Sequence, residues 1–598
     1  MTEKHYGPTL KVSSEIHAMK YRSKGESFKD AMVRVADALK DGEEHYVAFK
    51  DILLDMRFLP AGRVQSAMGS PRIVTPYNCF VSRTINDSMG DIMEAAKEAA
   101  ETMRLGGGIG YDFSTLRPRG ALIKSLDTRS SGPIAFMDIF DAICKTIASA
   151  GHRRGAQMGV LRVDHPDIEE FVEAKTNSSR LTQFNISVGI TDEFMEAVRS
   201  NTMFNLRFEG VVYKQVSAVA LWNKILRFTW DWAEPGVLFL DTINKKNNLF
   251  YCEVIAATNP CGEQPLPPFG ACLLGSTNLV KYIEPNYTTV RVTDEGEGPE
   301  EQVGWFFDYD QLEADIPHIV RSMDNVVDRA TYPLPEQEVE AKSKRRMGLG
   351  LTGVANAGEI LGYQYGSPSF LKWLEGVMEF YRDVVYKASV ELAKEKGSFP
   401  LFDAGQFLQS GFTLTLTEEL RDDVRLHGIR NSHLLSIAPT GTISLSADNV
   451  SSGIEPVFSH FYDRTIQTFD GPTVERVEDY AYRVYGVKGR TADQTPVQDH
   501  VAVLNLASRY VDSACSKTCN VGNDVTWEEF KDVYMSAWLG GASGCTTFRL
   551  AGKRYGILNA AAVEDVAVEE EVVVDDFIDE KEGGACFIDP STGRRTCE

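Results

Sequence analysis

The sequence predicts an α/β protein built as one large unit, and three observations support this class. Amphipathic helical patterns alternate with short runs rich in branched residues, an order that favours an α/β architecture with much parallel strand pairing. The chain of 598 residues is 43% hydrophobic, which is enough to bury a large core. No long Pro/Gly-rich linker interrupts residues 50–555. Periodicity alone does not decide whether this unit closes into a barrel.

Individual elements carry clear local signals. The stretch "PIAFMDIFDAICKTIASAG" predicts an amphipathic helix over residues 133–150, with Pro133 in its first turn and a stop at Gly151. The runs "FNISVGI" and "HLLSIAP" predict strands between helical patterns. Thr526 and Glu529 predict a capping box for a further helix, which the glycines at 540 and 541 close.

The charge balance excludes several classes of partner. A formal net charge of -23 argues against binding to a nucleic-acid backbone, because such proteins present a basic face. The start "MTEKHYGPTLKV" has no basic region leading into an apolar run, and no apolar stretch approaches the roughly 20 residues of a membrane span. We therefore expect a cytoplasmic protein without nucleic-acid or membrane partners. In that reducing compartment its ten cysteines are more often catalytic, metal-bound or buried than disulfide-bonded.

The carboxyl end has a different composition. Residues 560–584 carry ten acidic residues and a single lysine, a charge run typical of a solvated linker. Cys586 and Cys597 follow, at the end of this arm. They are either incidental or a mobile dithiol that carries electrons, and the dithiol is the sharper hypothesis because exposed thiols oxidise readily.

Three loops have the composition of phosphate-binding turns, each with a plainer alternative. "LGGGIGYDFS" indicates either a close backbone approach to a ligand or a plain tight turn. "APTGTISLSA" offers hydroxyls and backbone amides as an anion cradle, or is simply a hydroxyl-rich turn. Arg153 and Arg154 in "GHRRGAQMG" could clamp a nucleotide or decorate the surface.

The stretch "NPCGEQPLPPFGACLLGSTNL" suggests radical chemistry. Asn259, Cys261 and Glu263 stand at alternate positions, and Cys272 follows. No histidine lies nearby to activate a thiolate, and the cysteine spacing is wrong for a zinc knuckle. A thiyl radical needs no adjacent base, and it abstracts hydrogen from carbon more easily when a carboxylate and an amide hold the substrate hydroxyls. In an extended segment, residues two apart would share one face. A leaving hydroxyl then needs a proton and two electrons, which a cysteine pair can supply.

Six motifs in order resemble the ribonucleotide reductase family, over roughly residues 50 to 560. They are "YNCFVSRTINDSMGDIMEAAKEAAETMRLGGGIGYDFSTLRPRG", "RRGAQMGVLRVDHPDIEEFVEAK", "NISVGITDEFMEAV", the cysteine stretch above, "RRMGLGLTGVANAG" and "APTGTISL". The resemblance implies a ten-stranded α/β barrel with the radical cysteine on a central finger loop. It also implies a reaction that converts ribonucleotides to 2′-deoxyribonucleotides.

The resemblance assigns roles to single residues. Cys261 matches the thiyl radical site, Glu263 the base at the 3′-hydroxyl, and Asn259 the amide that binds the ribose hydroxyls. Cys79 and Cys272 match the pair that becomes a disulfide on each turnover. Substrate binding is expected at Ser66, Asn78, Thr440, Gly441, Thr442 and Ser444. Cys586 and Cys597 match the tail pair that re-reduces the active site with electrons from thioredoxin, although their separation is longer than usual in the family.

The source of the radical distinguishes the classes of the family. Class I large subunits carry a tandem tyrosine that receives a radical from a second subunit, and no Tyr-Tyr pair occurs here. The segment "SKTCNVGNDVTWEEFKDVYMSAWLGG" resembles class II enzymes, whose radical comes from adenosylcobalamin. The carboxyl end lacks a recognisable glycyl-radical motif, which argues against class III. The alternatives are a class I large subunit or a non-catalytic nucleotide-binding barrel. Cys515, Cys519 and Cys545 could bind a metal, but we interpret them as structural and expect no metal beyond the cofactor's cobalt.

The expected organisation has four parts: a short helical region (1–49), the barrel with its effector-binding helices and loops (50–559), an acidic linker (560–584) and a redox tail (585–598). We see no room for a separate amino-terminal ATP-cone. A deoxynucleotide effector is expected at Asp138, Arg153, Arg154 and Gln183, by resemblance to dimeric relatives. The expected assembly is a homodimer.

Overall fold

The computed structural model describes most of the chain, and statements below refer to those residues. They are residues 5–147, 156–176, 180–286, 290–291, 300–301, 304–468, 471–522, 524–549, 587–588 and 595–596. No helix in these ranges is long and apolar enough to cross a membrane.

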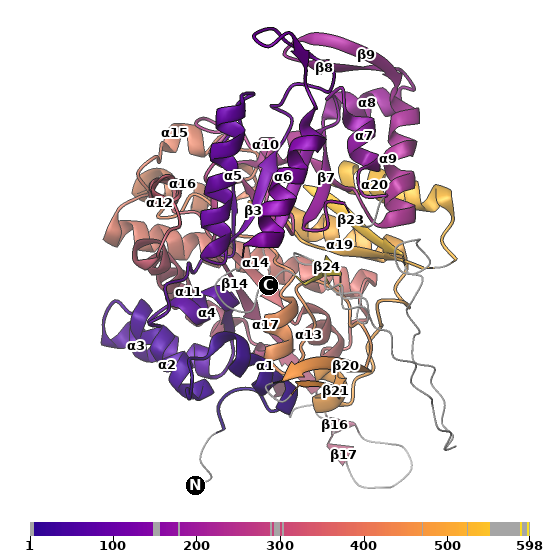
Figure 1. Cartoon of the computed structure of the whole chain (residues 1–598). Helices are drawn as coiled ribbons and strands as arrows, with labels where there is room; N and C mark the ends of the chain where they lie inside the picture. Colours follow the sequence, from indigo (N-terminus) through magenta and orange to yellow (C-terminus); the bar gives the residue numbers. More distant parts are fainter. Residues whose placement is uncertain are drawn as a thin grey trace.

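A mixed eight-stranded sheet forms one half of the molecule (Figure 1). Its order is β13 (Ala271–Cys272), β2 (Cys79–Val81), β3 (Gly108–Asp112), β6 (Gln157–Arg162), β7 (Phe184–Ile190), β10 (Gly236–Phe239), β23 (Gly544–Arg549) and β22 (Thr518–Val521). Five consecutive strands, from β2 to β10, run parallel. Their crossovers hold α5 (Met89–Arg104), α6 (Pro133–Thr146), α7 (Ile168–Glu173), α8 (Asp192–Arg199) and α9 (Ala218–Trp232). Helices α19 (Val497–Arg509) and α20 (Trp527–Leu539) flank the β22–β23 edge.

A three-stranded sheet forms the other half, in the order β1 (Phe58–Pro60), β14 (Leu274–Asn278) and β19 (Gly348–Thr352). Around it lie α4 (Gly62–Ala67), α11 (Tyr309–Arg329), α12 (Pro335–Lys344), α13 (Val354–Ile360), α14 (Pro368–Lys396), α16 (Glu418–His427) and α17 (Gly441–Ser446). The amino-terminal helices α1 (Lys11–Tyr21), α2 (Phe28–Leu39) and α3 (Glu43–Leu54) cover this half from below in Figure 1. Each half has its own cluster of buried apolar side chains.

The remaining elements are short. The helices among them are α10 (Leu240–Lys246), α15 (Ala404–Phe407) and α18 (Tyr480–Tyr485), with the 3-10 helices η1 (Leu279–Tyr282) and η2 (Thr413–Thr415). The strands form two-stranded antiparallel pairs: β4 (Leu122–Ile123) with β5 (Thr128–Arg129), β8 (Met203–Phe208) with β9 (Val211–Ser217), β11 (Ala257–Thr258) with β12 (Pro265–Leu266), and β15 (Ile283–Asn286) with β18 (Gly304–Phe307). Three more such pairs are β16 (Val290–Arg291) with β17 (Glu300–Glu301), β20 (Phe461–Thr468) with β21 (Gly471–Glu478), and β24 (Phe587–Ile588) with β25 (Arg595–Thr596).

The two sheets are linked without forming one closed sheet among the described residues. On one side β13 leads into β14 with only Leu273 between them. On the other side, isolated parallel bridges join Leu349 to Leu435 and Ile437 to Cys515, just before β22. The α/β prediction is therefore confirmed, whereas the predicted strand "HLLSIAP" is wrong, because that segment makes only these single bridges. Two of its backbone amides bond to a side chain instead of to a neighbouring strand: the Leu434 and Leu435 amides donate to the Asp512 carboxylate at 2.7 and 2.9 Å.

Other local predictions are confirmed. The run "FNISVGI" is strand β7 over its full length. The capping box of α20 forms as expected, since Thr526 accepts from the Glu529 amide and the Glu529 carboxylate accepts from the Thr526 amide. Helix α6 starts at Pro133 but ends at Thr146, four residues before the predicted end.

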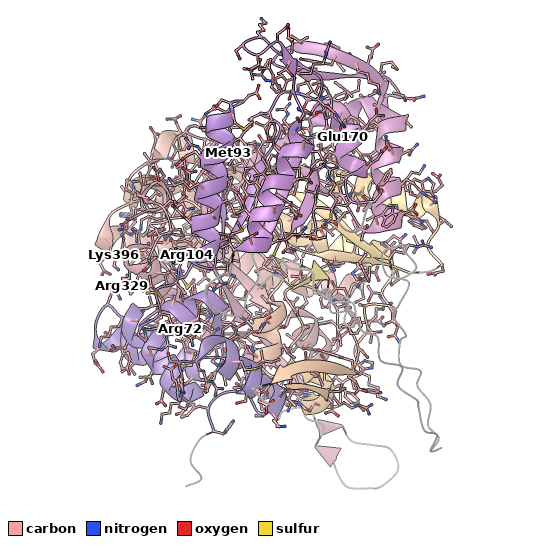
Figure 2. All side chains as sticks on the ribbon, viewed as in Figure 1. Arg72, Met93, Arg104, Glu170, Arg329 and Lys396 are labelled. Atoms are coloured by element: carbon pink, nitrogen blue, oxygen red, sulfur yellow. The ribbon has the colours of Figure 1, made fainter. Side chains whose placement is uncertain are left out.

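The amino-terminal helices are tied to the larger body by charge. Asp41, between α2 and α3, accepts from Arg329 at 2.8 Å and also pairs with Lys396 and Arg321. Figure 2 shows Arg329 and Lys396 together beside these helices. Burial alone would raise the pKa of Asp41, but the bonds from Lys396 and its neighbours outweigh burial and lower that pKa to about 2.

Candidate active site

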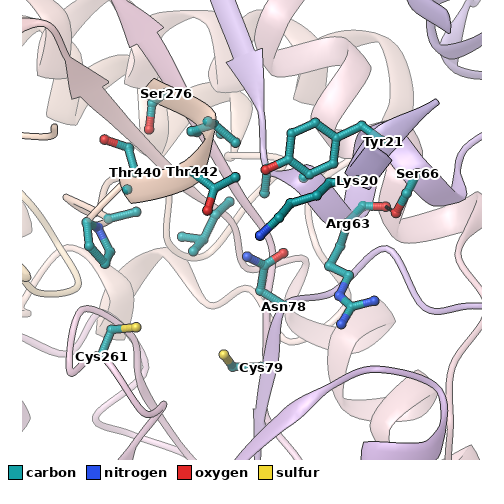
Figure 3. A pocket seen from close by; sticks show the side chains of 18 of the residues that line it. Lys20, Tyr21, Arg63, Ser66, Asn78, Cys79, Cys261, Ser276, Thr440 and Thr442 are labelled. Carbon is teal, nitrogen blue, oxygen red and sulfur yellow. Dashed lines mark hydrogen bonds between the residues drawn. The ribbon is translucent and has the colours of Figure 1, made fainter. Parts of the chain in front are cut away.

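A cavity of about 320 Å³ opens between the two halves (Figure 3). Its walls include four residues expected at the site, namely Cys261, Glu263, Cys79 and Asn78. They also include the expected substrate-binding residues Ser66, Thr440, Gly441 and Thr442. A volume near 300 Å³ is at the small end of ligand pockets, and it suits one nucleotide-sized molecule.

The cysteine stretch forms a hairpin, which corrects the expectation of an extended segment. Strands β11 and β12 pair antiparallel and place Cys261 in the loop between them. The turn is closed by the Gly262 amide, which donates to the Asn259 carbonyl at 3.1 Å. Gly262 has a φ of 81°, which glycine adopts more easily than other residues. Cys261 and Glu263 line the cavity from this turn, whereas Asn259, at the base of the turn, is not among the lining residues.

The hairpin tip is held from three sides. Asn185 on β7 donates to the Pro260 carbonyl at 3.0 Å. The Glu263 carbonyl accepts from the Ser436 hydroxyl at 2.9 Å and from the Ala514 amide at 3.0 Å. These contacts come from both halves of the molecule, so the loop tip is fixed where the halves meet.

The glycine-rich stretch "LGGGIG" makes room for this loop. A Cβ at Gly110 on β3 would lie 1.9 Å from the Thr258 carbonyl oxygen, closer than any real contact. The motif is therefore neither a tight turn alone nor, in the described geometry, a phosphate loop. Its glycine allows the base of the hairpin to pass directly over strand β3.

Cys79 and Cys272 are brought face to face. They are direct partners in the antiparallel pairing of β2 and β13, and both are buried. Direct partners on antiparallel strands have Cα separations of about 4.5–5.5 Å, which is within the range that a disulfide spans. Burial raises the pKa of the Cys272 thiol well above its usual value, and nearby Cys79 and Glu263 raise it further. The Cys272 thiol is therefore protonated and can give up hydrogen with its electrons.

Cys261 is disulfide-bonded in this structure. Its side chain is 2% exposed. A disulfide sulfur cannot hold a thiyl radical, so Cys261 must be reduced before it can act. The described arrangement is thus an oxidised one.

Several polar atoms at the site have no hydrogen-bond partner among the described residues. They are Asn259 Nδ2, Asn78 Oδ1 and Ser276 Oγ, all shielded from solvent. The Asn259 side chain is oriented by its oxygen, Oδ1, which accepts from the backbone amide of Gln264 at 3.0 Å. Buried polar groups without partners are costly, so these three atoms are suited to bind a polar ligand.

The hydroxyl-rich turn at α17 is only partly directed at the cavity. Thr440 adopts a left-handed conformation with φ 51°, and its hydroxyl accepts from the Gly453 amide at 2.7 Å. Thr442 lines the cavity. Ser444 does not line it, because its hydroxyl is bonded to Ser452 at 2.9 Å and to the Gly441 carbonyl. Ser444 thus supports the turn in this geometry.

Two of the expected effector residues, Asp138 and Gln183, do not line this cavity. Asp138 on α6 binds Arg180 through two hydrogen bonds of 3.0 and 2.8 Å. Gln183 is buried, and its backbone amide donates to the Asp141 carboxylate at 2.8 Å. Arg153 and Arg154 lie outside the described residues, as do Cys586 and Cys597.

The three carboxyl-side cysteines do not form a metal site. Within the described part of the chain, no group of three His, Cys, Asp or Glu side chains could hold a metal ion. Cys519 and Cys545 are buried neighbours on β22 and β23, and their hydrogen bond raises the pKa of Cys545.

Sequence reasoning missed the cationic wall of the cavity. Lys20 and Tyr21 on α1, Arg63 on α4, and Arg72 all line it, as does Ser276 on β14. No local motif marks these residues. Only the packing of α1 against α4 and α17 brings Lys20 to the cavity.

Comparison with known proteins agrees with this geometry. Residues 77–484 match the family described as "Ribonucleotide reductase, barrel domain". The chain is 32% identical to a vitamin B12-dependent ribonucleoside-diphosphate reductase of Mycobacterium tuberculosis (strain CDC 1551 / Oshkosh), over 91% of this chain and 79% of that protein. It is 32% identical to the protein of that name from Thermoplasma acidophilum (89% and 68% covered), and 27% identical to a vitamin B12-dependent ribonucleotide reductase of Streptomyces clavuligerus (88% and 62% covered). The chain therefore belongs to the ribonucleotide reductase family.

Proposed function

We propose that this protein reduces ribonucleotides to 2′-deoxyribonucleotides with adenosylcobalamin as the radical source. One observation carries the proposal: a single cavity brings together Cys261, Glu263 and Cys79, with Cys272 directly opposite Cys79. The names of its relatives support the vitamin B12-dependent reaction over that of a class I large subunit.

Cys261 is the residue that would react with the cofactor, whose corrin ring would lie outside the cavity that we assign to the substrate. The cavity reaches Cys261 and is nucleotide-sized, and a corrin macrocycle is larger than this space. When bound, the cofactor supplies the radical by homolysis of its cobalt–carbon bond. Cys261, held at the hairpin tip by Asn185, would lie next to the adenosyl arm.

The chain's own residues carry the reduction. The Cys261 thiyl takes the hydrogen atom from C3′, while Glu263 accepts the proton of the 3′-hydroxyl and Asn259 Nδ2 donates to a ribose hydroxyl. The 2′-hydroxyl leaves as water. Cys79 and Cys272 supply two hydrogens and two electrons and become a disulfide, and Cys261 returns its hydrogen to C3′. Ribonucleotide plus dithiol thus gives deoxyribonucleotide, disulfide and water.

The substrate phosphates are assigned to the side of the cavity opposite Cys79. Thr442 and the backbone of Gly441 contact the inner phosphate, and Ser66 supports it from α4. Asn78, whose Oδ1 has no partner among the described residues, accepts from the ribose. Thr440 and Ser444 hold the turn itself, which their hydrogen bonds to Gly453 and Ser452 support.

Electrons return through the tail, with thioredoxin as the external dithiol. Cys586 directly precedes β24 and Cys597 directly follows β25, and these two strands pair antiparallel. The pairing of these two strands supports an approach of the two cysteines despite their long separation in the sequence. Strand β25 also contacts α17, which lines the cavity. This contact supports a tail that reaches the active site, with residues 560–584 as its linker.

We assign to this chain the allosteric effector site and the dimeric assembly that its resemblance to dimeric relatives implies. A deoxynucleotide effector binds near Asp138, Arg153, Arg154 and Gln183, and the protein acts as a homodimer. Exposed methionines on α5 support an interface there: Met89 is 61% and Met93 46% exposed, and Figure 2 shows Met93 on the outer face of that helix. We assign the two sheets, linked through the bridges at Leu349 and Ile437, to the ten-stranded barrel that the family resemblance implies.

The test is turnover by the purified chain alone. With adenosylcobalamin, a ribonucleoside diphosphate and dithiothreitol, we expect deoxynucleotide without any second protein. A requirement for a metal-containing partner, with no response to the cofactor, would replace this proposal by the class I alternative.

A further inference from the structure

Helix α1 is built into the wall of the active site. The Asp448 carboxylate, from the loop after α17, accepts the amides of Thr9 and Leu10 at 2.7 and 2.8 Å. One turn further, the buried Ser13 hydroxyl donates to the Leu445 carbonyl at 2.6 Å. The first half of α1 is therefore fixed to the helix that carries the phosphate turn.

The second half of α1 is fixed to α4. His17 Nε2 lies 3.0 Å from the Gln65 amide oxygen, and both side chains are buried. The Tyr21 ring packs on Gly62 so closely that a Cβ there would lie 2.3 Å from the ring. With both halves fixed, Lys20 is held where it lines the cavity.

The cavity is cationic although the protein is acidic. Its described lining contains Lys20, Arg63 and Arg72 and a single carboxylate, that of Glu263, in a chain with a net charge of -23. Figure 3 shows the Lys20 amino group directed toward Asn78, between Thr442 and Arg63. The sulfur atoms of Cys261 and Cys79 lie on another side of the same space. A ligand that reacts at the sulfurs and carries negative charge at its other end matches this division.

We propose that Lys20 and Arg63 bind the outermost phosphate of the ribonucleotide, so that α1 selects for the length of the phosphate chain. This inference rests on the proposed function, because the ribose must lie at Cys261. The inner phosphate lies on the Thr442 turn, and the next phosphate reaches the two cations. Lysine binds phosphate as a point charge and arginine as a planar fork, so both suit a terminal phosphate.

The test is equilibrium binding by calorimetry, without cobalamin and hence without turnover. Ribonucleoside mono- and diphosphates of the same base are titrated into the reduced full-length protein, Lys20→Met and Arg63→Met. Lys11→Met is the matched control, since Lys11 lies on the same helix, pairs with Glu15 at 3.6 Å and does not line the cavity. Lys20→Arg keeps the charge, and thermal melts check folding.

Each cavity variant should weaken diphosphate binding roughly tenfold to a hundredfold but change monophosphate binding less than about threefold. Lys20→Arg should recover most of the diphosphate affinity, and Lys11→Met should match the wild type. Equal weakening of both nucleotides, or none, would overturn the inference. Its failure is distinct from failure of the proposed function, because the binding result does not depend on whether Cys261 or the cofactor initiates the reaction.

Discussion

The two ends of the active-site cavity differ in how they are built. At the sulfur end, Cys261 lies on a short hairpin whose reacting residues are close in sequence. At the cationic end, Lys20 and Arg63 come from separate helices, and α1 reaches its place through contacts to Asp448 and Leu445, more than 400 residues away. The reacting residues of the hairpin are thus neighbours in the sequence, whereas the cationic residues are brought together only by the packing of separate helices. The sulfur end can be identified from sequence, whereas the cationic end is visible only in the fold.

The largest effect should come from removing the reductant of the sulfur end. Cys79→Ser or Cys272→Ser should lower multiple turnover by roughly a thousandfold or more with thioredoxin or dithiothreitol, since no other pair can supply the two electrons. Cys252→Ser is the control, because Cys252 is an exposed thiol outside the cavity, and it should be active. Normal cycling of either cavity variant would show that the facing cysteines are not the reductant.

The next effect tests whether the hairpin depends on a distant glycine. Gly110→Ala puts a methyl group 1.9 Å from the Thr258 oxygen, so the loop or the strand must move. A displacement near 1 Å should lower the turnover rate by roughly a hundredfold, with a loss of stability of about 1–3 kcal/mol. Gly376→Ala, within α14 and with nothing within 4 Å, should instead stabilise by about 0.5–1 kcal/mol. Equal behaviour of the two variants in activity and melting would contradict the close approach.

The tail separates two routes for electrons to the sulfur end. A flexible linker of about 25 residues has a root-mean-square reach of roughly 25–30 Å, which is enough to visit the cavity and return. Truncation after Gly584 should abolish thioredoxin-supported cycling but spare a single turnover of pre-reduced enzyme and much of the dithiothreitol-supported rate. Full-length Cys586→Ser should behave like the truncation. If the truncated enzyme cycles normally with thioredoxin, the tail is not the shuttle.

The smallest effect concerns how the amino-terminal helices stay docked. Because the pKa of Asp41 is lowered to about 2, its carboxylate stabilises the fold above the unfolded pKa near 4, and this stability is lost as pH falls toward 2. Asp41→Asn should cost about 1–2 kcal/mol at pH 7 and nothing near pH 2. Asp37→Asn is the control, since its pair with Lys40 is mostly exposed. Denaturant melts across pH check this, and a pH-independent difference would contradict it.

Sequence predicted the parts of this molecule that depend on neighbouring residues or on ordered motifs. The α20 capping box and β7 are local, and the facing of Cys79 and Cys272 came from resemblance to a family. The turn of the hairpin is closed locally at Gly262, but its close passage over β3 was missed because that depends on Gly110, a residue of another strand. The failed strand at 433–439 has branched residues but pairs through single bridges, with its amides taken by Asp512. Nothing near Lys20 in sequence marks it as a cavity residue.

The most direct test of the central claim is a single turnover of pre-reduced Cys261→Ala with adenosylcobalamin and substrate. Cys79 and Cys272 remain in this variant, so the reductant is intact and only the proposed initiator is absent. We predict no deoxynucleotide above about a thousandth of the wild-type rate, a difference of roughly 4 kcal/mol in activation free energy, with unchanged melting and nucleotide binding. Deoxynucleotide formation above that level in a folded variant would contradict the claim that the Cys261 thiol initiates the reaction.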